Sequence, residues 1–175
     1  MKILISFIIA FIFAFSSESV YPLSKDYFVV VDKSGNERFL DMRGKDYIVV
    51  SLREEGADGR FYAVDRDGCV WMNGVISSGA VGHRTPTGVF SVKRKARFHM
   101  STKYPDVISG RNNMDYSLFF TWQGHALHLG NINSMSHGCV HVYYGKIEGL
   151  FKWGQIGMPV IVTRNRYLPH VIYEL

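Results

Sequence analysis

The chain has 175 residues, of which 47% are hydrophobic and 14% aromatic, and its formal net charge is +5. This length suits one well-buried domain and is too short for two domains of ordinary size, and the composition excludes a disordered chain. The positive charge would favour anionic surroundings. However, the one short basic run, at residues 93–97, fits a solvated positive face better than a nucleic-acid groove, so we expect no nucleic-acid partner.

The first 19 residues have the shape of a secretory signal peptide. Met1 and Lys2 precede an apolar run over residues 3–15, which is too short for a comfortable membrane span. We therefore expect an exported protein, located in the periplasm or the cell wall. The segment lacks a clean Ala-x-Ala cleavage site, so residues 1–19 could also be an uncleaved anchor. Only in that case do we expect contact with a membrane.

Short strands separated by turn residues predict a mainly β protein in the next part of the chain. Residues 20–44 should form a β-hairpin extension, with strands at 27–31 and 37–42 joined by a glycine turn. Further along, Asn73 and Gly74 should separate two short strands. No internal repeat or low-complexity tract is visible.

The second half of the chain alternates between ordered and irregular stretches. Residues 99–113 show no periodicity, and long irregular segments in compact domains are often lids or binding loops, so we expect this loop to border a substrate groove. The aromatic run at 115–122 predicts a buried strand. Helical spacing of apolar residues predicts a short helix over 143–153, followed by a strand at 158–163. Residues 165–175 form a tail in which the sequence indicates no chemistry.

Chemistry is concentrated between His125 and His141, which include four of the seven histidines and one of the two cysteines. The thiolate is the nucleophilic form of cysteine, and a nearby imidazolium would lower the pKa of Cys139. Gly138 has no Cβ, so the backbone there can adopt a left-handed conformation and bring its amides close to an oxyanion. This stretch therefore indicates a cysteine nucleophile.

The same residues also allow a zinc site. His125 and His128 are three residues apart, His137 and His141 are four apart, and Cys139 lies between the latter two. Strand-like alternation would point His125 and His128 to opposite faces, which argues against one shared metal ion. We therefore expect no metal and no other cofactor.

Two cysteines in an exported protein also suggest a disulfide between Cys69 and Cys139. A permanent disulfide would leave no free thiol to act as the nucleophile, so we expect Cys139 to be free. Cys69 begins a strand-like segment, where a packed thiol is the ordinary explanation.

Two separate motifs resemble the YkuD-type L,D-transpeptidase catalytic domain. One is Ser136-His137-Gly138-Cys139-Val140, preceded by His128-Leu129-Gly130; the other is Thr85-Pro86-Thr87-Gly88 upstream. The resemblance covers residues 45–164. It implies a single L,D-transpeptidase-like domain, a β-sandwich or mixed sheet with one short helix after the catalytic cysteine.

The resemblance also implies an activity, that of a peptidoglycan L,D-transpeptidase acting through a cysteine thioester on stem tetrapeptides. Cys139 would be the nucleophile and His128 the general base, oriented by the backbone carbonyl of Leu129. Backbone amides around Gly138 and Cys139 would hold the oxyanion. The acyl group would pass to an amine of a second stem peptide or of a wall-attached protein.

Three further residues would shape the substrate pocket. Ser136 and His137 flank the nucleophile, and His141 would bind substrate. The family usually has arginine or asparagine at the position of His141, and histidine would hold a carboxylate less firmly than arginine. The segment between His128 and Cys139 is also shorter than is common. Two alternatives remain: an L,D-carboxypeptidase that uses water as acceptor, and a non-catalytic cell-wall-binding protein whose histidines hold zinc.

Overall fold

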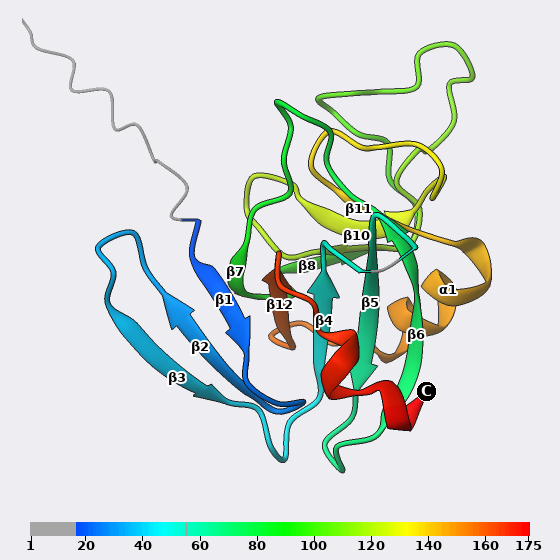
Figure 1. Ribbon diagram of the computed structural model, residues 1–175. Helices are drawn as coiled ribbons and strands as arrows, with labels where there is room; N and C mark the ends of the chain where they lie inside the picture. Colours follow the sequence, from blue (N-terminus) through cyan, green and yellow to red (C-terminus); the bar gives the residue numbers. More distant parts are fainter. Residues whose placement is uncertain (1–16, 55) are drawn as a thin grey trace, which may run out of the picture.

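The computed structural model describes residues 17–54 and 56–175. Residues 1–16, which make up most of the expected signal peptide or anchor, lie outside the described residues. Within the described ranges the chain forms two β-sheets and one α-helix, so the prediction of a mainly β fold is confirmed (Figure 1). None of the helices in these ranges is long and apolar enough to cross a membrane.

The larger sheet contains nine of the described strands and is mixed in direction. In chain order they are β4 (Tyr47–Ser51), β5 (Gly59–Val64), β6 (Val70–Ser77), β7 (Gly88–Ser91), β8 (Arg94–Ala96), β9 (Ser117–Phe119), β10 (Ala126–Leu129), β11 (Val140–Val142) and β12 (Pro159–Thr163). Their order across the sheet is β7-β12-β4-β5-β6-β11-β10-β9-β8. The pairs β10/β11 and β4/β12 are parallel, and the other pairs are antiparallel.

The smaller sheet lies at the N-terminal end and has the order β1 (Ser19–Pro22), β2 (Tyr27–Val31) and β3 (Glu37–Asp41). Strands β2 and β3 form the expected hairpin, and Gly35, with φ +83°, lies in the turn between them. Strand β1 pairs with β2 and was not expected from the sequence. The extension is therefore a three-stranded sheet.

Both faces of the central strands are buried, because alternate residues pack into two different cores. On β4, Ile48 and Val50 join the core that contains Ile147 and Leu150 of helix α1 (Tyr144–Trp153). Tyr47 and Val49 join a second core, which contains residues of the N-terminal sheet and of the C-terminal segment. Figure 1 shows the N-terminal sheet and α1 on either side of the central strands. The result is a sandwich around β4, β5 and β12.

The C-terminal segment is part of this second core. Two 3-10 turns, Leu168–His170 and Ile172–Glu174, follow β12. Tyr167 is fully buried, and the buried carboxylate of Glu54 accepts hydrogen bonds from the backbone N–H groups of Tyr167 and Leu168 at 2.9 and 3.0 Å. The sequence indicated only a tail here, because the partners that bury it are distant in the chain.

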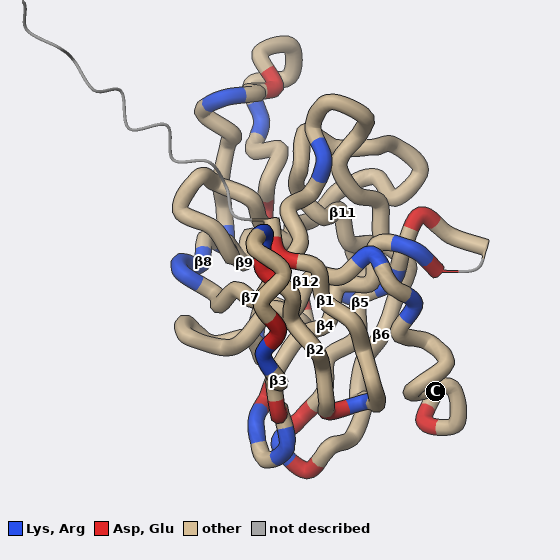
Figure 2. The backbone as a smooth tube through the Cα atoms, turned by 60° about the vertical axis from the view of Figure 1, so that its left-hand side comes forward, with Lys and Arg blue, Asp and Glu red and all other residues tan. Residues whose placement is uncertain are grey.

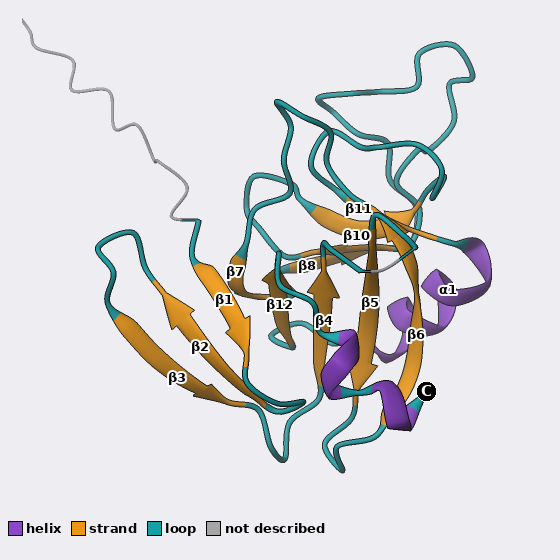
Figure 3. Ribbon diagram, in the orientation of Figure 1, coloured by secondary structure: helices purple, strands orange, loops and turns teal. Residues whose placement is uncertain are grey.

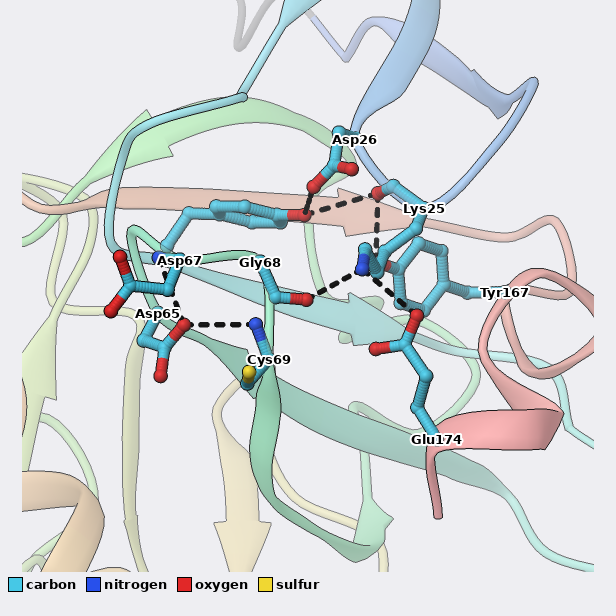
Figure 4. Close-up of polar contacts among 9 residues, drawn as sticks. Lys25, Asp26, Asp65, Asp67, Gly68, Cys69, Tyr167 and Glu174 are labelled. Atoms are coloured by element: carbon cyan, nitrogen blue, oxygen red, sulfur yellow. Dashed lines mark hydrogen bonds and ion pairs between the residues drawn. The ribbon is translucent and has the colours of Figure 1, made fainter.

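A polar cluster around Lys25 joins three parts of the chain (Figure 4). Its ammonium donates to the carbonyl of Gly68 and pairs with Glu174 at 2.8 Å, while its carbonyl accepts the hydroxyls of Tyr47 and Tyr167. We call this group the Lys25 cluster. Its contacts connect the N-terminal sheet, the turn before β6 and the C-terminal end.

Two local predictions were wrong. Strand β6 runs continuously through Asn73 and Gly74, where a turn was expected. Gly74 is required there by packing, since a Cβ would lie 2.8 Å from the ring of Phe61. The aromatic strand is also shorter than expected, because the N–H groups of Phe120 and Thr121 turn back to the carbonyl of His125.

The remaining predictions for this region hold. Helix α1 lies within the expected range, with Ile147 and Leu150 buried, and it ends at Gly154. Strand β12 forms within the predicted range and lies between β7 and β4 in the large sheet. The helix follows the cysteine-containing segment directly, as the resemblance implied.

Candidate active site

Long loops gather at the end of the molecule that carries β10 and β11 (Figure 3). They enclose a cavity of about 950 Å³. Its lining includes His99, Asn113 and residues 101–105, so the prediction that the irregular loop 99–113 borders a groove is confirmed. Trp122, at the end of the aromatic run, is 76% exposed and also lines the cavity.

His128 reaches this cavity from β10, and Cys139 reaches it from the residue just before the neighbouring parallel strand β11. In the β10/β11 register, Leu127 lies opposite Val140 and His128 lies opposite His141. Leu127 and Val140 point into the core beneath, so the residues that alternate with them point outward into the cavity. Cys139 directly precedes β11; it packs against Ala126, which lies on the His128 face of β10, and it lines the same cavity. The strand pairing brings the predicted nucleophile and base to one surface.

The orientation of His128 follows from one hydrogen bond. Its Nδ1 lies 2.7 Å from the carbonyl oxygen of Leu129, the interaction that the resemblance implied. A carbonyl oxygen only accepts, so Nδ1 carries the proton and Nε2 is the basic nitrogen of the neutral ring. Burial, with a smaller contribution from the neighbouring His141 imidazole, lowers the pKa of His128 to about 4. The ring is therefore neutral near pH 7.

Cys139 is partly buried against Met114, Phe119 and Ala126. This burial raises the pKa of the thiol, and a hydrogen bond from the backbone N–H of Ala126 offsets only part of the effect. The expectation that an imidazolium would lower the pKa of Cys139 is thus wrong for the free protein. Because His128 is buried, it is neutral and supplies no positive charge. The resting pair is a thiol beside a neutral imidazole.

Both cysteines are free thiols in the structure. For Cys139 this agrees with the prediction. Cys69 was expected to be packed, but it lies exposed in the turn before β6, where its N–H donates to the Asp65 carboxylate (Figure 4).

The segment before the nucleophile is fixed by a tight hydrogen-bond arrangement. Ser136 Oγ donates to the carbonyl of Cys139 at 2.6 Å and accepts the N–H of Gly138 at 3.0 Å. Gly138 has φ +111°, the left-handed geometry predicted for it. Its N–H, however, is engaged by Ser136 and is not free to bind an oxyanion in this conformation.

The upstream motif packs against this segment on the side away from the cavity. Gly79 pairs with Ser136 in a parallel bridge, and a Cβ on Gly79 would lie 2.8 Å from the Cα of Gly138. Thr85 Oγ1 accepts the N–H of Gly79 at 2.9 Å, and Arg164 donates to the carbonyl of Thr85. The Thr85–Gly88 motif therefore acts through the backbone behind the nucleophile and does not line the cavity.

His137 is exposed and joins the nucleophile segment to the neighbouring loops. Its ring stacks on Tyr104 with centroids 4.0 Å apart and an interplanar angle of 18°, and it meets His83 edge-on at 4.8 Å. Tyr104 belongs to loop 99–113. His137 therefore closes one wall of the cavity.

His141 lines the cavity but is already engaged by the backbone. Its Nδ1 lies 3.0 Å from the carbonyl oxygens of both Asn131 and Ser134, so this nitrogen donates to the short loop between β10 and β11. A side chain at Gly130 would collide with the His141 ring. Only Nε2 of His141 is left for a substrate, and the assignment of this residue as a substrate ligand stays a prediction.

His125 was assigned to the face opposite His128, and this was wrong. Strand β10 begins at Ala126, so His125 lies in the preceding turn, where Thr121 holds it at 2.9 Å, and both histidines line the cavity. Its ring packs over Gly138. Strand alternation could not reveal this, because the strand starts one residue later. Even so, no three His, Cys, Asp or Glu side chains of the described ranges are grouped to hold a metal ion.

Comparison with known proteins agrees with this arrangement. A family model for the YkuD L,D-transpeptidase catalytic domain matches residues 45–162, about two thirds of the chain. The chain belongs to this family. A search of curated proteins found no match.

Solved L,D-transpeptidases share the fold at low sequence identity. The enzyme from Enterococcus faecium is 22% identical with a TM-score of 0.56, and the match covers 69% of this chain and 50% of that one. The enzyme from Stackebrandtia nassauensis is 22% identical with a TM-score of 0.56, covering 71% and 58%. L,D-transpeptidase 3 from Mycobacterium tuberculosis, solved with a faropenem-derived adduct, is 17% identical with a TM-score of 0.55, covering 85% and 78%. The present chain thus spans only about half the length of the first two.

Proposed function

We propose that this protein is a peptidoglycan L,D-transpeptidase that forms a thioester at Cys139 with a stem tetrapeptide. One observation carries the proposal: Cys139, which packs against Ala126 of β10, and His128 of the same strand line one cavity. The hydrogen bond from His128 Nδ1 to Leu129 leaves Nε2 as the proton acceptor. Family membership supports the same assignment.

The reaction would proceed in two acyl-transfer steps. As Cys139 Sγ bonds to the amide carbonyl carbon, its proton passes to His128 Nε2 and the carbonyl oxygen becomes an oxyanion. The C–N bond then breaks, and the imidazolium returns its proton to the departing D-alanine amine. In the second step an acceptor amine attacks the thioester carbonyl and gives a proton to His128. The C–S bond then breaks, and the imidazolium returns this proton to Cys139 Sγ.

The neutral resting pair has a consequence for this mechanism. With the pKa of Cys139 raised and that of His128 lowered, little thiolate is present before substrate binds. Proton transfer would therefore accompany attack on the carbonyl. The N–H of Cys139 is our candidate oxyanion donor, and the N–H of Gly138 would have to exchange its bond to Ser136 before it could contribute.

The acceptor and the location extend the same proposal. The acceptor would be an amine of a second stem peptide or of a wall-attached protein, reached in the periplasm or cell wall after export. If water is the acceptor, the same thioester gives an L,D-carboxypeptidase. The faropenem-derived adduct of the M. tuberculosis relative motivates a related expectation, that β-lactams of this class acylate Cys139.

The test is incubation with a defined stem tetrapeptide, with mass spectrometry of both protein and products. We expect an acyl adduct on Cys139, loss of D-alanine, and cross-linked product when an amine acceptor is added. Replacing His128 by alanine should lower turnover by about 10²–10⁴-fold, the usual effect of losing a general base. His170→Ala, at the far C-terminal segment, serves as control. Near-normal turnover in folded His128→Ala, or no adduct on Cys139, would contradict the proposal.

A further inference from the structure

The cavity around Cys139 is lined by basic residues and has no acidic side chain in its described lining. The two cations are Arg94 and Lys103, and five histidines accompany them. A site with this charge pattern favours an anionic ligand, since a carboxylate entering it meets no like charge. The position of the two cations decides which one could hold that ligand.

The basic run at 93–97 is divided by strand geometry. Lys93 bonds to Ser91 Oγ, Lys95 bonds to the carbonyl of Gly154 and lies over the ring of Phe151, and Arg97 lies over Tyr116. Arg94 alternates with Lys95 on β8, so it points to the other face and lines the cavity. The expectation of a solvated positive face is therefore incomplete. Figure 2 marks the basic residues near β8 in blue.

Arg94 is held close to the nucleophile by an aromatic ring. It lies opposite Phe119 in the β8/β9 register, and its guanidinium carbon is 3.6 Å from the centroid of the Phe119 ring. Phe119 is buried and packs in the small cluster that Cys139 also contacts. A single aromatic ring thus links the guanidinium to the environment of the thiol.

The stacked guanidinium keeps its hydrogen-bonding edge available. Among the described residues, the Arg94 side chain takes part in no ion pair or hydrogen bond, and its guanidinium lies over the Phe119 ring. Arginine binds a carboxylate with two parallel N–H groups, a geometry that lysine lacks. Lys103 lies on the exposed loop, with its ammonium 5.4 Å from the Tyr104 ring centroid, and is less firmly positioned. His141, as described above, donates Nδ1 to its own loop.

We propose that Arg94 is the carboxylate anchor of this site and that it selects donor peptides with a free carboxylate close to the scissile amide. This inference rests on the proposed transpeptidase function. The carboxylate could be that of the terminal D-residue or that on the side chain of the third residue. Both offer the same charged, planar group, so amidation of each in turn distinguishes them.

The kinetic test compares the tetrapeptide with its two monoamides. Arg94→Gln should lower kcat/KM for the free acid by roughly tenfold or more, the effect of losing a charge-assisted hydrogen-bonded pair. Arg94→Gln should also abolish the preference for the free acid over one of the two monoamides, the one that is amidated at the carboxylate that Arg94 binds. Lys93→Gln removes the same charge outside the cavity and should keep that preference. Arg94→Lys keeps the charge but lacks the two parallel N–H groups of the guanidinium, so it should retain only part of the preference for the free acid.

A binding test separates this inference from the proposed function. Calorimetry with the Cys139→Ala protein measures affinity for the acid and the amides without any turnover. Tighter binding of the acid, lost in Cys139→Ala/Arg94→Gln and retained with Lys93→Gln, supports the anchor even if no catalysis is found. Equal binding of acid and both amides, or an unchanged preference without Arg94, overturns it. Failure of acylation in the wild type would instead refute the proposed function.

Discussion

The second core and the cavity differ in whether their polar side chains have partners within the protein. In the core beneath the N-terminal sheet, the hydroxyls of Tyr47 and Tyr167 share the carbonyl of Lys25. Glu54 Oε1 accepts two backbone N–H groups, and its Oε2, which has no hydrogen bond among the described residues, lies 4.0 Å from Arg166 Nε. At the cavity, within the part of the chain that the structure describes, Arg94 has no acidic partner and the His128 ring forms a hydrogen bond only through Nδ1. Paired groups stabilise the fold, while groups left with open donors or acceptors are available to a ligand.

This difference predicts that the two regions respond differently to substitution. Changes in the second core should lower the free energy of unfolding and leave the activity of each folded molecule unaltered. Changes at the cavity should lower the activity and leave the free energy of unfolding unaltered. The exception is a buried titratable group, which affects both quantities. Three substitutions test this separation, beginning with the largest expected effect.

Tyr167→Ala removes the largest buried side chain of the C-terminal segment. The ring stacks near Phe28 at 5.9 Å and meets Tyr62 edge-on at 5.0 Å, so its loss leaves a cavity in the second core. We expect the free energy of unfolding to fall by about 3–5 kcal/mol, measured by urea denaturation. Tyr173→Ala, at a side chain that is 99% exposed, should change it by less than about 0.5 kcal/mol. Similar losses in the two variants would show that the C-terminal segment does not belong to this core.

Tyr167 also illustrates what the sequence could not predict. The helix, the left-handed Gly138 and the contact between His128 and Leu129 depend on neighbouring residues or a matched motif, and all were predicted correctly. The burial of Tyr167 depends on residues more than 100 positions away. No local pattern records such a contact.

The candidate site shows the same division. The motif indicated His128 and Cys139, but the direction of their pKa shifts depends on how deeply each is buried, which the sequence does not specify. His125 was misassigned because alternation was applied across a strand boundary. Arg94 was included in a solvated basic run, since the sequence does not show that alternation along β8 turns Arg94 toward the cavity and Lys95 away from it.

The lowered pKa of His128, a cavity residue, makes the free energy of unfolding depend on pH. Burial lowers its pKa from 6.5 to about 4, so as the pH falls the unfolded chain binds the proton first and the folded state is destabilised. The effect is absent well above pH 6.5, grows between pH 6.5 and 4, and reaches about 3 kcal/mol below that range.

We therefore expect acid denaturation of the wild type to begin at higher pH than that of His128→Gln, once both are compared with their stability at pH 7.5. The exposed His83→Gln should follow the wild type. Urea denaturation at intervals between pH 7.5 and 4 measures the difference. Parallel curves for wild type and His128→Gln would mean that the ring is accessible to water, and would remove the argument for a neutral resting pair.

The smallest effect is expected for the ion pair of the Lys25 cluster. The side chains of Lys25 and Glu174 are 22% and 35% exposed, so solvent and salt screen their attraction. Lys25→Met should lower the free energy of unfolding by no more than about 1 kcal/mol, and 1 M salt should reduce the difference. Lys33→Met, in the exposed turn between β2 and β3, is the matched charge control and should have no effect. A loss as large as that of Tyr167→Ala would mean that this cluster, and not the aromatic packing around Tyr167, holds the C-terminal segment in place.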